Sequence, residues 1–224
     1  EDGIPLSEIE QLEGTGRSGR VTKKDILLYL EKKDHEAPDI KHPDVKVAIP
    51  VTGRSEEMHH MRKMISKHMM ESLNTSAHVY VMTEVDMTSI VDFVKKKQDE
   101  FKEREGYALT YTPFIIESVI KSLKDYPEMN SSISGSKVDY HRDINIGLAV
   151  AIENGLMVPA ITNCEEKNFL GICRSVNDVA KRTRDGSVGS DELSGTTFTI
   201  TNFGVFGVSM GTPIINQPNV GILG

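Results

Sequence analysis

The feature that most limits what this chain can fold into is a stretch without hydrophobic periodicity, residues 34–48. It contains Pro38 and Pro43 among mixed charges, a composition typical of an extended linker. It separates residues 1–33 from residues 49–224 of the 224-residue chain. Because a domain usually has about 100–200 residues, the sequence predicts one full domain preceded by a small module.

The small module is predicted to hold two short helices joined by a glycine-rich loop. The first begins at Ser7, which has the spacing of a capping box with Glu10, and the second begins after Thr22 and carries an apolar stripe around Ile26. The loop at residues 14–19 matches the pattern G-x-G-x-x-G, but a dinucleotide site requires a strand before that loop. A helix is expected there instead, which favours a structural turn over a nucleotide site.

The larger part alternates helical and strand patterns without a strict strand–helix repeat. Apolar residues at helical spacing predict helices over residues 56–73, 88–104, 112–126 and 168–184. Strand patterns occur at residues 78–85, 136–141, 144–152, 196–201 and 220–224, with a turn at 155–159. We expect 78–85 to be half-buried, because its apolar and polar residues alternate. The irregular order predicts an α+β fold with a mixed sheet rather than a doubly wound parallel sheet.

Charge, cysteine and histidine patterns argue against several functions. Lys and Arg number 26 against 33 Asp and Glu, a net charge of −7, whereas nucleic-acid binders are usually basic. No apolar run approaches the ~20 residues of a membrane span. The two cysteines, Cys164 and Cys173, favour a reducing compartment over a disulfide framework. No histidine spacing fits a metal site; His78 and His141 are expected to form hydrogen bonds at strand edges.

A threonine-rich strand pattern near residue 200 allows two interpretations. On a strand, Thr197, Thr199 and Thr201 share one face, which is common for a face exposed to water. However, Thr201 and Asn202 end the strand and run into glycines that let a ligand approach the backbone. A hydroxyl and an amide at that place are suitable hydrogen-bond donors to an oxyanion.

Several blocks of the larger part, with residues 14–26, carry a resemblance to one family. The blocks are Arg62–Ile65 with Ser72, His78-Val79, Ile146–Ala151 with Gly155–Pro159, Gly195–Asn202, Thr212–Pro218 and Ile222–Gly224. They resemble the catalytic domain of the dihydrolipoamide acyltransferases, the core components of the 2-oxo acid dehydrogenase complexes. Residues 14–26 resemble the peripheral subunit-binding domain that precedes it. The resemblance implies a partial binding domain at 1–33, a linker at 34–48 and a catalytic domain at 49–224, incomplete at its carboxyl end.

The resemblance implies a chloramphenicol-acetyltransferase-like fold and transfer of an acyl group from dihydrolipoamide to coenzyme A. In this family a histidine deprotonates the thiol of coenzyme A, and a hydroxyl of the facing subunit donates a hydrogen bond to the tetrahedral oxyanion. By motif position the hydroxyl belongs to Thr201, and Asn202, Arg62 and Ser134 match the coenzyme A channel. The resemblance implies that the lipoyl group is carried by a separate domain, which we do not expect within this chain.

The catalytic histidine of the family is the main departure. It lies in an Asp-His-Arg-x-x-Asp-Gly motif, which does not occur in these 224 residues. The apolar run Val220–Gly224 is typical of the start of a core strand, so we expect the fold to continue beyond it. We therefore expect the 1–224 chain alone to be inactive in acyl transfer.

The resemblance also implies partners and a location. The family forms homotrimers that build larger cubic or dodecahedral cores. Arg20 matches a basic residue of the module that docks the 2-oxo acid decarboxylase and dihydrolipoamide dehydrogenase components. Arg17, on the same loop, is a second candidate cation for binding an acidic partner surface. Neither a nucleic acid nor a membrane is an expected partner, and the expected location is the bacterial cytoplasm, or the mitochondrial matrix in a eukaryote.

Two other functions and three acyl groups stay open. A non-catalytic homologue would keep the fold and the binding module and only recruit partner enzymes to the complex. A stand-alone coenzyme A acetyltransferase is disfavoured, because a free enzyme has no use for a docking module. The segment Thr212–Asn216 leans towards succinyl transfer, with acetyl and branched-chain acyl groups as alternatives.

Overall fold

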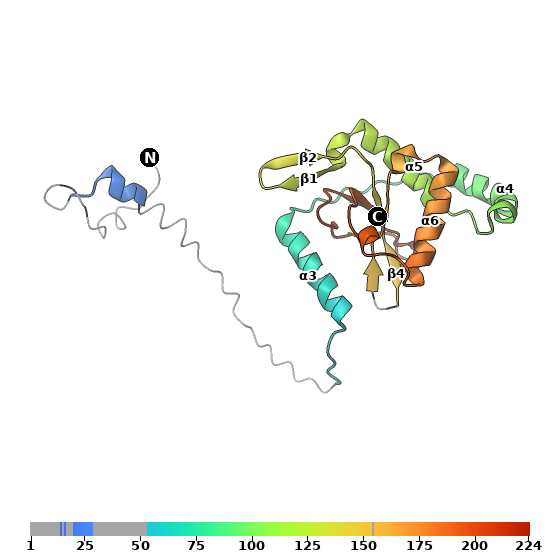
Figure 1. The fold of residues 1–224 in the computed structure, drawn as a ribbon, viewed down its shortest axis with the longest axis horizontal. Helices are drawn as coiled ribbons and strands as arrows, with labels where there is room; N and C mark the ends of the chain where they lie inside the picture. Colours follow the sequence, from blue (N-terminus) through green and yellow to red (C-terminus); the bar gives the residue numbers. More distant parts are fainter. Residues whose placement is uncertain (1–13, 15, 17–19, 29–52, 154) are drawn as a thin grey trace. The chain divides into compact units, whose positions relative to one another are not determined.

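A computed structural model describes residues 14, 16, 20–28, 53–153 and 155–224. The chain divides into two compact units, Glu1–Ser55 and Glu56–Gly224 (Figure 1). Three predicted features lie outside the described residues: the helix that begins at Ser7, the side chain of Arg17 and the linker at 34–48.

The first unit contains the predicted helix that follows Thr22. Residues 23–28 are helical, and both the amide and the hydroxyl of Thr22 donate to Asp25 Oδ2, over 2.8 and 2.9 Å. This is a side-chain cap of the helix start. The Gly16 amide donates to the Arg20 carbonyl over 2.9 Å and draws the two ends of the loop together.

The second unit contains the four predicted long helices. They are α3 (His60–Thr75), α4 (Thr88–Glu105), α5 (Thr112–Asp125) and α6 (Phe169–Arg184). Proline sets both limits of α5, because Pro113 needs no amide partner in the first turn and Pro127 follows its end. The side chain of Asn168 caps α6 by accepting from the Gly171 amide over 2.8 Å. Single-turn 3-10 helices lie at Pro127–Met129, Cys164–Glu166, Asp191–Leu193 and Gly204–Phe206.

The strands form a mixed sheet, so the expected α+β architecture is confirmed. Four strands lie in the order β6 (Ala160–Ile161), β3 (Ile146–Leu148), β7 (Phe198–Ile200) and β8 (Ile222–Leu223). β3 pairs antiparallel with β6 and parallel with β7, and β7 pairs parallel with β8. Two further pairs are antiparallel: β1 (Ser131–Ser134) with β2 (Lys137–Tyr140), and β4 (Val150–Ile152) with β5 (Gly155–Met157).

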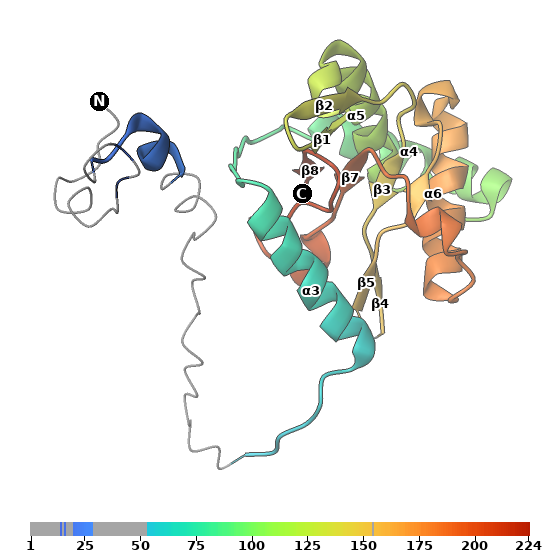
Figure 2. The ribbon, with the colours of Figure 1, turned by 60° about the vertical axis from the view of Figure 1, so that its left-hand side comes forward.

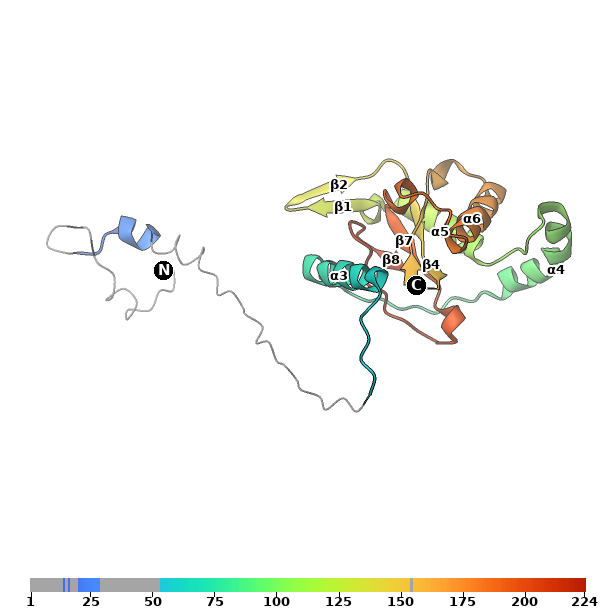
Figure 3. The same ribbon diagram turned by 60° about the horizontal axis from the view of Figure 1, so that its bottom comes forward.

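Helices lie on both sides of the sheet (Figures 2 and 3). α5 and α6 pack together over the strands, and the main core joins their apolar faces to β3 and β7 through residues such as Ile116, Ile146 and Ile172. α3 runs on the other side and contacts β5 (Figure 2). A smaller cluster around Phe101 and Cys173 joins α4 to α6.

The predicted half-buried strand at 78–85 is wrong. Residues 77–87 are in no strand of the described structure, and Val79, Val81 and Val85 are 85, 91 and 70% exposed. Alternation in the sequence fixes which residues share a face, but burial needs a second surface to cover that face. The segment therefore presents apolar side chains to solvent.

The predicted turn at 155–159 is also wrong, because residues 155–157 pair with β4. Within the described part of the chain, no helix combines the length and the hydrophobicity that a membrane crossing requires.

Candidate active site

The candidate site lies where β7 ends. Phe198 and Ile200 of β7 are buried in the main core, and the chain leaves the sheet at Thr201 and Asn202. The amide of Thr201 donates to the Leu223 carbonyl over 2.8 Å and so extends the pairing of β7 with β8 by one residue. Thr201 is thus fixed by the sheet through its backbone, while its side chain is half-buried at the sheet's end.

The threonine hydroxyls before Thr201 are engaged in hydrogen bonds. Thr199 is fully buried, and its hydroxyl accepts from Asn219 Nδ2 over 2.7 Å. The hydroxyl of Thr197 accepts from the Asn145 amide over 3.0 Å. The interpretation of this threonine row as a solvent-exposed face is therefore wrong, because asparagines from two distant segments cover it.

Thr201 differs from these threonines. Its hydroxyl has no hydrogen-bond partner among the residues that the structure describes. A hydroxyl that the fold does not use, on a backbone that the sheet holds in place, can donate to a developing oxyanion without first breaking another bond.

The loop after Thr201 is held by its own side chains. Asn202 is exposed, and its Oδ1 accepts from the Gly204 amide over 2.8 Å, so its Nδ2 group remains available as a donor. The ring of Phe203 lies against Gly211 and Gly224; a Cβ at Gly211 would come within 2.8 Å of that ring. Glycine at these two places leaves room for the ring of Phe203.

The segment Ile215–Gln217, which leads to β8, is bound to the carboxyl end of α3. Ser72 Oγ, which is buried, donates to the Ile215 carbonyl over 2.6 Å. The Ile215 amide donates to His78 Nε2 over 3.0 Å. Gln217 Nε2 donates to the hydroxyls of Ser76, over 2.7 Å, and of Ser72, over 3.2 Å. We call Ser72, Ser76 and His78, which hold this segment, the α3 clamp.

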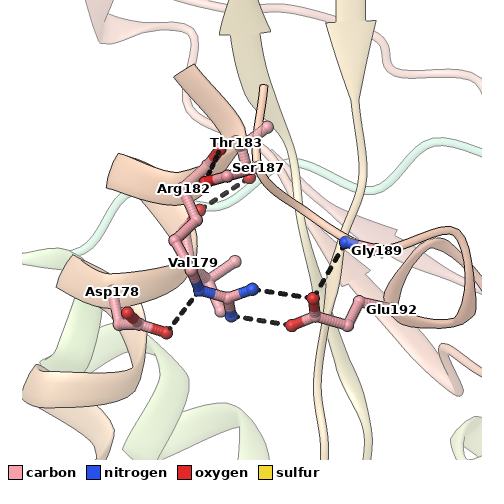
Figure 4. Close-up of polar contacts among 7 residues, drawn as sticks. All are labelled: Asp178, Val179, Arg182, Thr183, Ser187, Gly189 and Glu192. Carbon is pink, nitrogen blue, oxygen red and sulfur yellow. Dashed lines mark hydrogen bonds and ion pairs between the residues drawn. The ribbon is translucent and has the colours of Figure 1, made fainter. Parts of the chain in front are cut away.

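The segment between α6 and β7 is held by an ion pair (Figure 4). Both terminal nitrogens of Arg182 donate to the carboxylate of Glu192 over 2.7 Å, and Arg182 Nε donates to Asp178 over 2.8 Å. The Gly189 amide also donates to Glu192, over 3.0 Å. Hydrogen bonds from Arg182, and then from Gly189, lower the pKa of the Glu192 carboxyl to about 2.

The other predicted site residues lie apart from Thr201. Arg62 is exposed on α3, and Ser134 is exposed at the end of β1. No hydrogen bond or ion pair joins either of them to Thr201 or Asn202 within the described residues. Arg20 is exposed on the first unit, which is described by itself. The structure therefore brings together Thr201 and Asn202 only.

Neither of two hollows on the second unit includes Thr201. One, of about 240 Å³, lies at the amino end of β7 and is lined by residues from 141–145, 195–197 and Pro218. The other, of about 250 Å³, lies beside α4, with Phe93 and Phe169 in its wall. Among the described residues, no group of three His, Cys, Asp or Glu side chains is close enough to hold a metal ion.

Sequence reasoning missed the α3 clamp. It identified His78 as a hydrogen-bonding residue, which is confirmed, but did not identify its partner Ile215. The expected place at a strand edge is wrong, because residues 77–87 form no strand. Ser72 and Ile215 are 143 residues apart, and no local pattern reports a contact at that distance. The only sequence signal is the presence of both segments among the blocks of the family resemblance.

A family model decides the family. The model for the 2-oxoacid dehydrogenases acyltransferase (catalytic domain) matches residues 51–224, most of the chain. The chain belongs to this acyltransferase family.

Curated relatives from Bacillus subtilis agree: the acetyltransferase component of an acetoin cleaving system is 38% identical over 97% of the chain. The branched-chain alpha-keto acid dehydrogenase acyltransferase component and the 2-oxoglutarate dehydrogenase succinyltransferase component are each 36% identical over the whole chain. The chain spans about half the length of these relatives, 53 to 56%.

Solved structures of the family share the fold. A probable dihydrolipoamide acetyltransferase from Listeria monocytogenes is 37% identical with a TM-score of 0.73, over 76% of this chain and 73% of that one. The acetyltransferase of Azotobacter vinelandii, studied for a serine, a histidine and an asparagine in its catalytic mechanism, is 28% identical with a TM-score of 0.75, over 80 and 74%. The cubic core of a pyruvate dehydrogenase multienzyme complex matches with the same values. The expected fold of an acyltransferase core is confirmed.

Proposed function

We propose that this acyltransferase-family chain is part of the core of a 2-oxo acid dehydrogenase complex. The reaction is transfer of an acyl group from dihydrolipoamide to coenzyme A. The main support is that the backbone of Thr201 is held at the end of β7, while its hydroxyl forms no hydrogen bond with the described residues. Family membership and the names of three relatives, all acyltransferase components, support the reaction type.

In the proposed reaction the thiol of coenzyme A attacks the thioester carbonyl of the acylated lipoyl arm. The carbonyl oxygen becomes an oxyanion, to which Thr201 donates a hydrogen bond; the C–S bond to dihydrolipoamide then breaks. Asn202 lies beside this point, with its amide nitrogen available. We assign Arg62 and Ser134 to the channel for coenzyme A, because exposed cationic and hydroxyl groups suit its phosphates and amides. The base that deprotonates the thiol is the histidine of the Asp-His-Arg-x-x-Asp-Gly motif, which is not among these residues.

We propose that a neighbouring copy completes the site. Thr201 lies at the surface of one chain, near apolar side chains that this chain leaves exposed. Val205, Phe206 and Met210, in the loop after Thr201, are 62 to 72% exposed. Apolar surface of this extent is typical of a protein interface. The cubic core among the solved relatives supports a homotrimer that assembles further.

The first unit is proposed as the docking module for the decarboxylase and dihydrolipoamide dehydrogenase components. Arg20 is exposed beside its helix, as a docking cation must be, and Arg17 belongs to the same loop in the sequence. The lipoyl group that carries the substrate is attached to a different domain.

The acyl group is the open part of this function. The relatives that name acetyl, branched-chain and succinyl components differ by only two percentage points in identity, 38 against 36%. We favour succinyl on the segment Thr212–Asn216. The rates of acyl transfer with acetyl-, isobutyryl- and succinyl-coenzyme A would identify the acyl group.

Replacing Thr201 tests the proposed function. The assay uses a polypeptide that joins residues 1–224 to the histidine motif of the family. Thr201→Val keeps the shape and removes the hydroxyl, so we expect kcat to fall about 10²–10³-fold. Thr201→Ser keeps the hydroxyl and should retain most of the activity. Acyl transfer is measured by the coenzyme A-dependent loss of acyl-dihydrolipoamide.

Two results would contradict the proposal. Unchanged kcat in Thr201→Val would remove Thr201 from the oxyanion role. Absence of acyl transfer in the unaltered polypeptide, with retained binding of the partner enzymes, would favour the non-catalytic scaffold.

A further inference from the structure

His78 has both ring nitrogens bound to main-chain groups. Its Nδ1 lies 2.8 Å from the Ser76 carbonyl oxygen, and its Nε2 lies 3.0 Å from the Ile215 amide. A carbonyl can only accept and an amide can only donate, so these partners require a proton on Nδ1 and none on Nε2. The ring is therefore neutral and in one tautomer.

The α3 clamp holds Ile215 from both sides. While His78 accepts from its amide, Ser72 donates to its carbonyl over 2.6 Å. Gln217, two residues later, donates to Ser76. A segment with no regular secondary structure is thereby fixed to the end of a 16-residue helix at two successive points.

From Gln217 to β8 the chain has little freedom. Asn219 is buried and donates to the hydroxyl of Thr199 in β7. Only Val220 and Gly221 separate it from Ile222, the first residue of β8. Leu223 then accepts the hydrogen bond of the Thr201 amide. The position of the Leu223 carbonyl therefore depends on the segment that the α3 clamp fixes.

We propose that His78 is a positioning residue for Thr201. Its neutral imidazole accepts the Ile215 amide and fixes Ile215–Gln217, which sets β8 against β7 and holds Thr201 by its amide. Without that acceptor, the half-buried Ile215 amide loses its partner, and β8 and Thr201 are held less firmly. This inference rests on the proposed oxyanion role of Thr201.

Two substitutions test the roles of the two ring nitrogens of His78 independently. The glutamine side chain places its amide where Nε2 lies, so His78→Gln can still accept from Ile215. Asparagine is one methylene shorter and reaches the position of Nδ1, so His78→Asn keeps the bond to Ser76 and loses the acceptor. Both variants remove the imidazole and are therefore matched for loss of ring packing.

Amide hydrogen exchange on the 1–224 chain is the first measurement, because it needs no activity. We expect exchange at Ile215 and Thr201 to rise about fivefold to tenfold in His78→Asn and to stay near the unaltered rate in His78→Gln. A long-range ¹⁵N–¹H spectrum of the unaltered chain should show protonated Nδ1 and unprotonated Nε2. Ser72→Ala, which loosens the carbonyl of the same residue, should act in the same direction on Thr201.

Kinetics on the polypeptide that includes the histidine motif is the second measurement. A displaced oxyanion donor impairs the transition state, so His78→Asn should lower kcat about 10–100-fold with KM changed less than about twofold. His78→Gln should restore most of kcat. Two results would overturn the inference. One is an equal loss of kcat in His78→Asn and His78→Gln. The other is a rate of amide exchange at Thr201 that changes in neither His78→Asn nor Ser72→Ala. If the unaltered polypeptide were inactive, the proposed function would fail, whereas exchange at Thr201 would still decide whether His78 positions it.

Discussion

At the scale of single residues, Cys173 shows how the interior of this unit suppresses a reactive group. It lies on α6 against Phe101 and Leu109 and is 2% exposed. Burial is the main cause that raises the pKa of its thiol to about 11, and the charges of Glu105 and Glu117 act in the same direction. The reactive form of a cysteine is the thiolate, so this thiol is protonated at neutral pH.

We expect Cys173 to resist alkylation in the folded chain. At pH 8 the folded thiol should react with iodoacetamide at least roughly 100-fold more slowly than the same thiol in urea. Cys164, also buried with a raised pKa, should behave alike. Since the folded pKa of Cys173 is raised, its contribution to stability is complete below about pH 8.5 and is lost as the pH rises towards 11. Mass spectrometry of the labelled chain gives the rates; rapid labelling of Cys173 at pH 8 would contradict the expectation.

The threonines of β7 mark the limit of residue-level prediction. The sequence correctly predicts that the chain leaves a strand at Thr201. It does not reveal that Thr199 is buried, because the cover comes from Asn219, 20 residues later. Likewise the hydroxyl of Thr201 is distinguished from its neighbours by bonding partners that only the folded chain brings near.

At the scale of elements, the link from α6 to β7 depends on the Arg182–Glu192 ion pair. Two nitrogens of Arg182 donate to one carboxylate, so the pair is bidentate. This geometry distinguishes surface ion pairs that stabilise a fold from those that contribute little to stability. It links α6 to the segment that leads towards β7 (Figure 4).

We expect Glu192→Gln to lower the Tm by a few degrees at pH 7. The pKa of Glu192 is lowered in the fold to about 2, so the stabilisation is present above about pH 4.3 and is lost as the pH falls towards 2. The difference in Tm between the unaltered chain and the variant should therefore shrink between pH 5 and pH 2. Differential scanning calorimetry across that range tests this, with Glu166→Gln at an exposed carboxylate as the control. A difference that grows on acidification would refute the assignment.

Element prediction succeeded where the local signal was long. The helices α5 and α6 occur close to the predicted limits, since proline and side-chain caps determine them locally. Strands of two or three residues, such as β6 and β8, carry too few alternating positions to be delimited from sequence.

At the scale of the whole molecule, the exposed segment 77–87 points to association. Its valines alternate with Tyr80 and Met82, which are 47 and 57% exposed, so apolar side chains face solvent on both sides of the backbone. Sequence alone indicated a strand here, and the described structure supplies no neighbouring strand to pair with it.

We expect Val81→Lys to weaken self-association of the chain without unfolding it. Val81 is 91% exposed, so the charge costs little in the single chain, whereas burial of an unpaired lysine in an interface is strongly unfavourable. Analytical ultracentrifugation should show a lower average mass, with the Tm at low concentration unchanged. Thr162→Lys, an equal charge at another exposed site, should keep the unaltered mass distribution. Equal effects of the two lysines would argue against an interface at 77–87.

The separation of Ser72 from Ile215 also has a consequence for synthesis on the ribosome. Ile215 follows Ser72 by 143 residues, which take roughly 7–30 s to translate at about 5–20 residues per second. During that interval the segment that binds Ser72 has not yet been made. The candidate site is therefore completed late, and a ribosome that pauses inside this interval would leave a helix with its polar groups exposed and available to wrong partners.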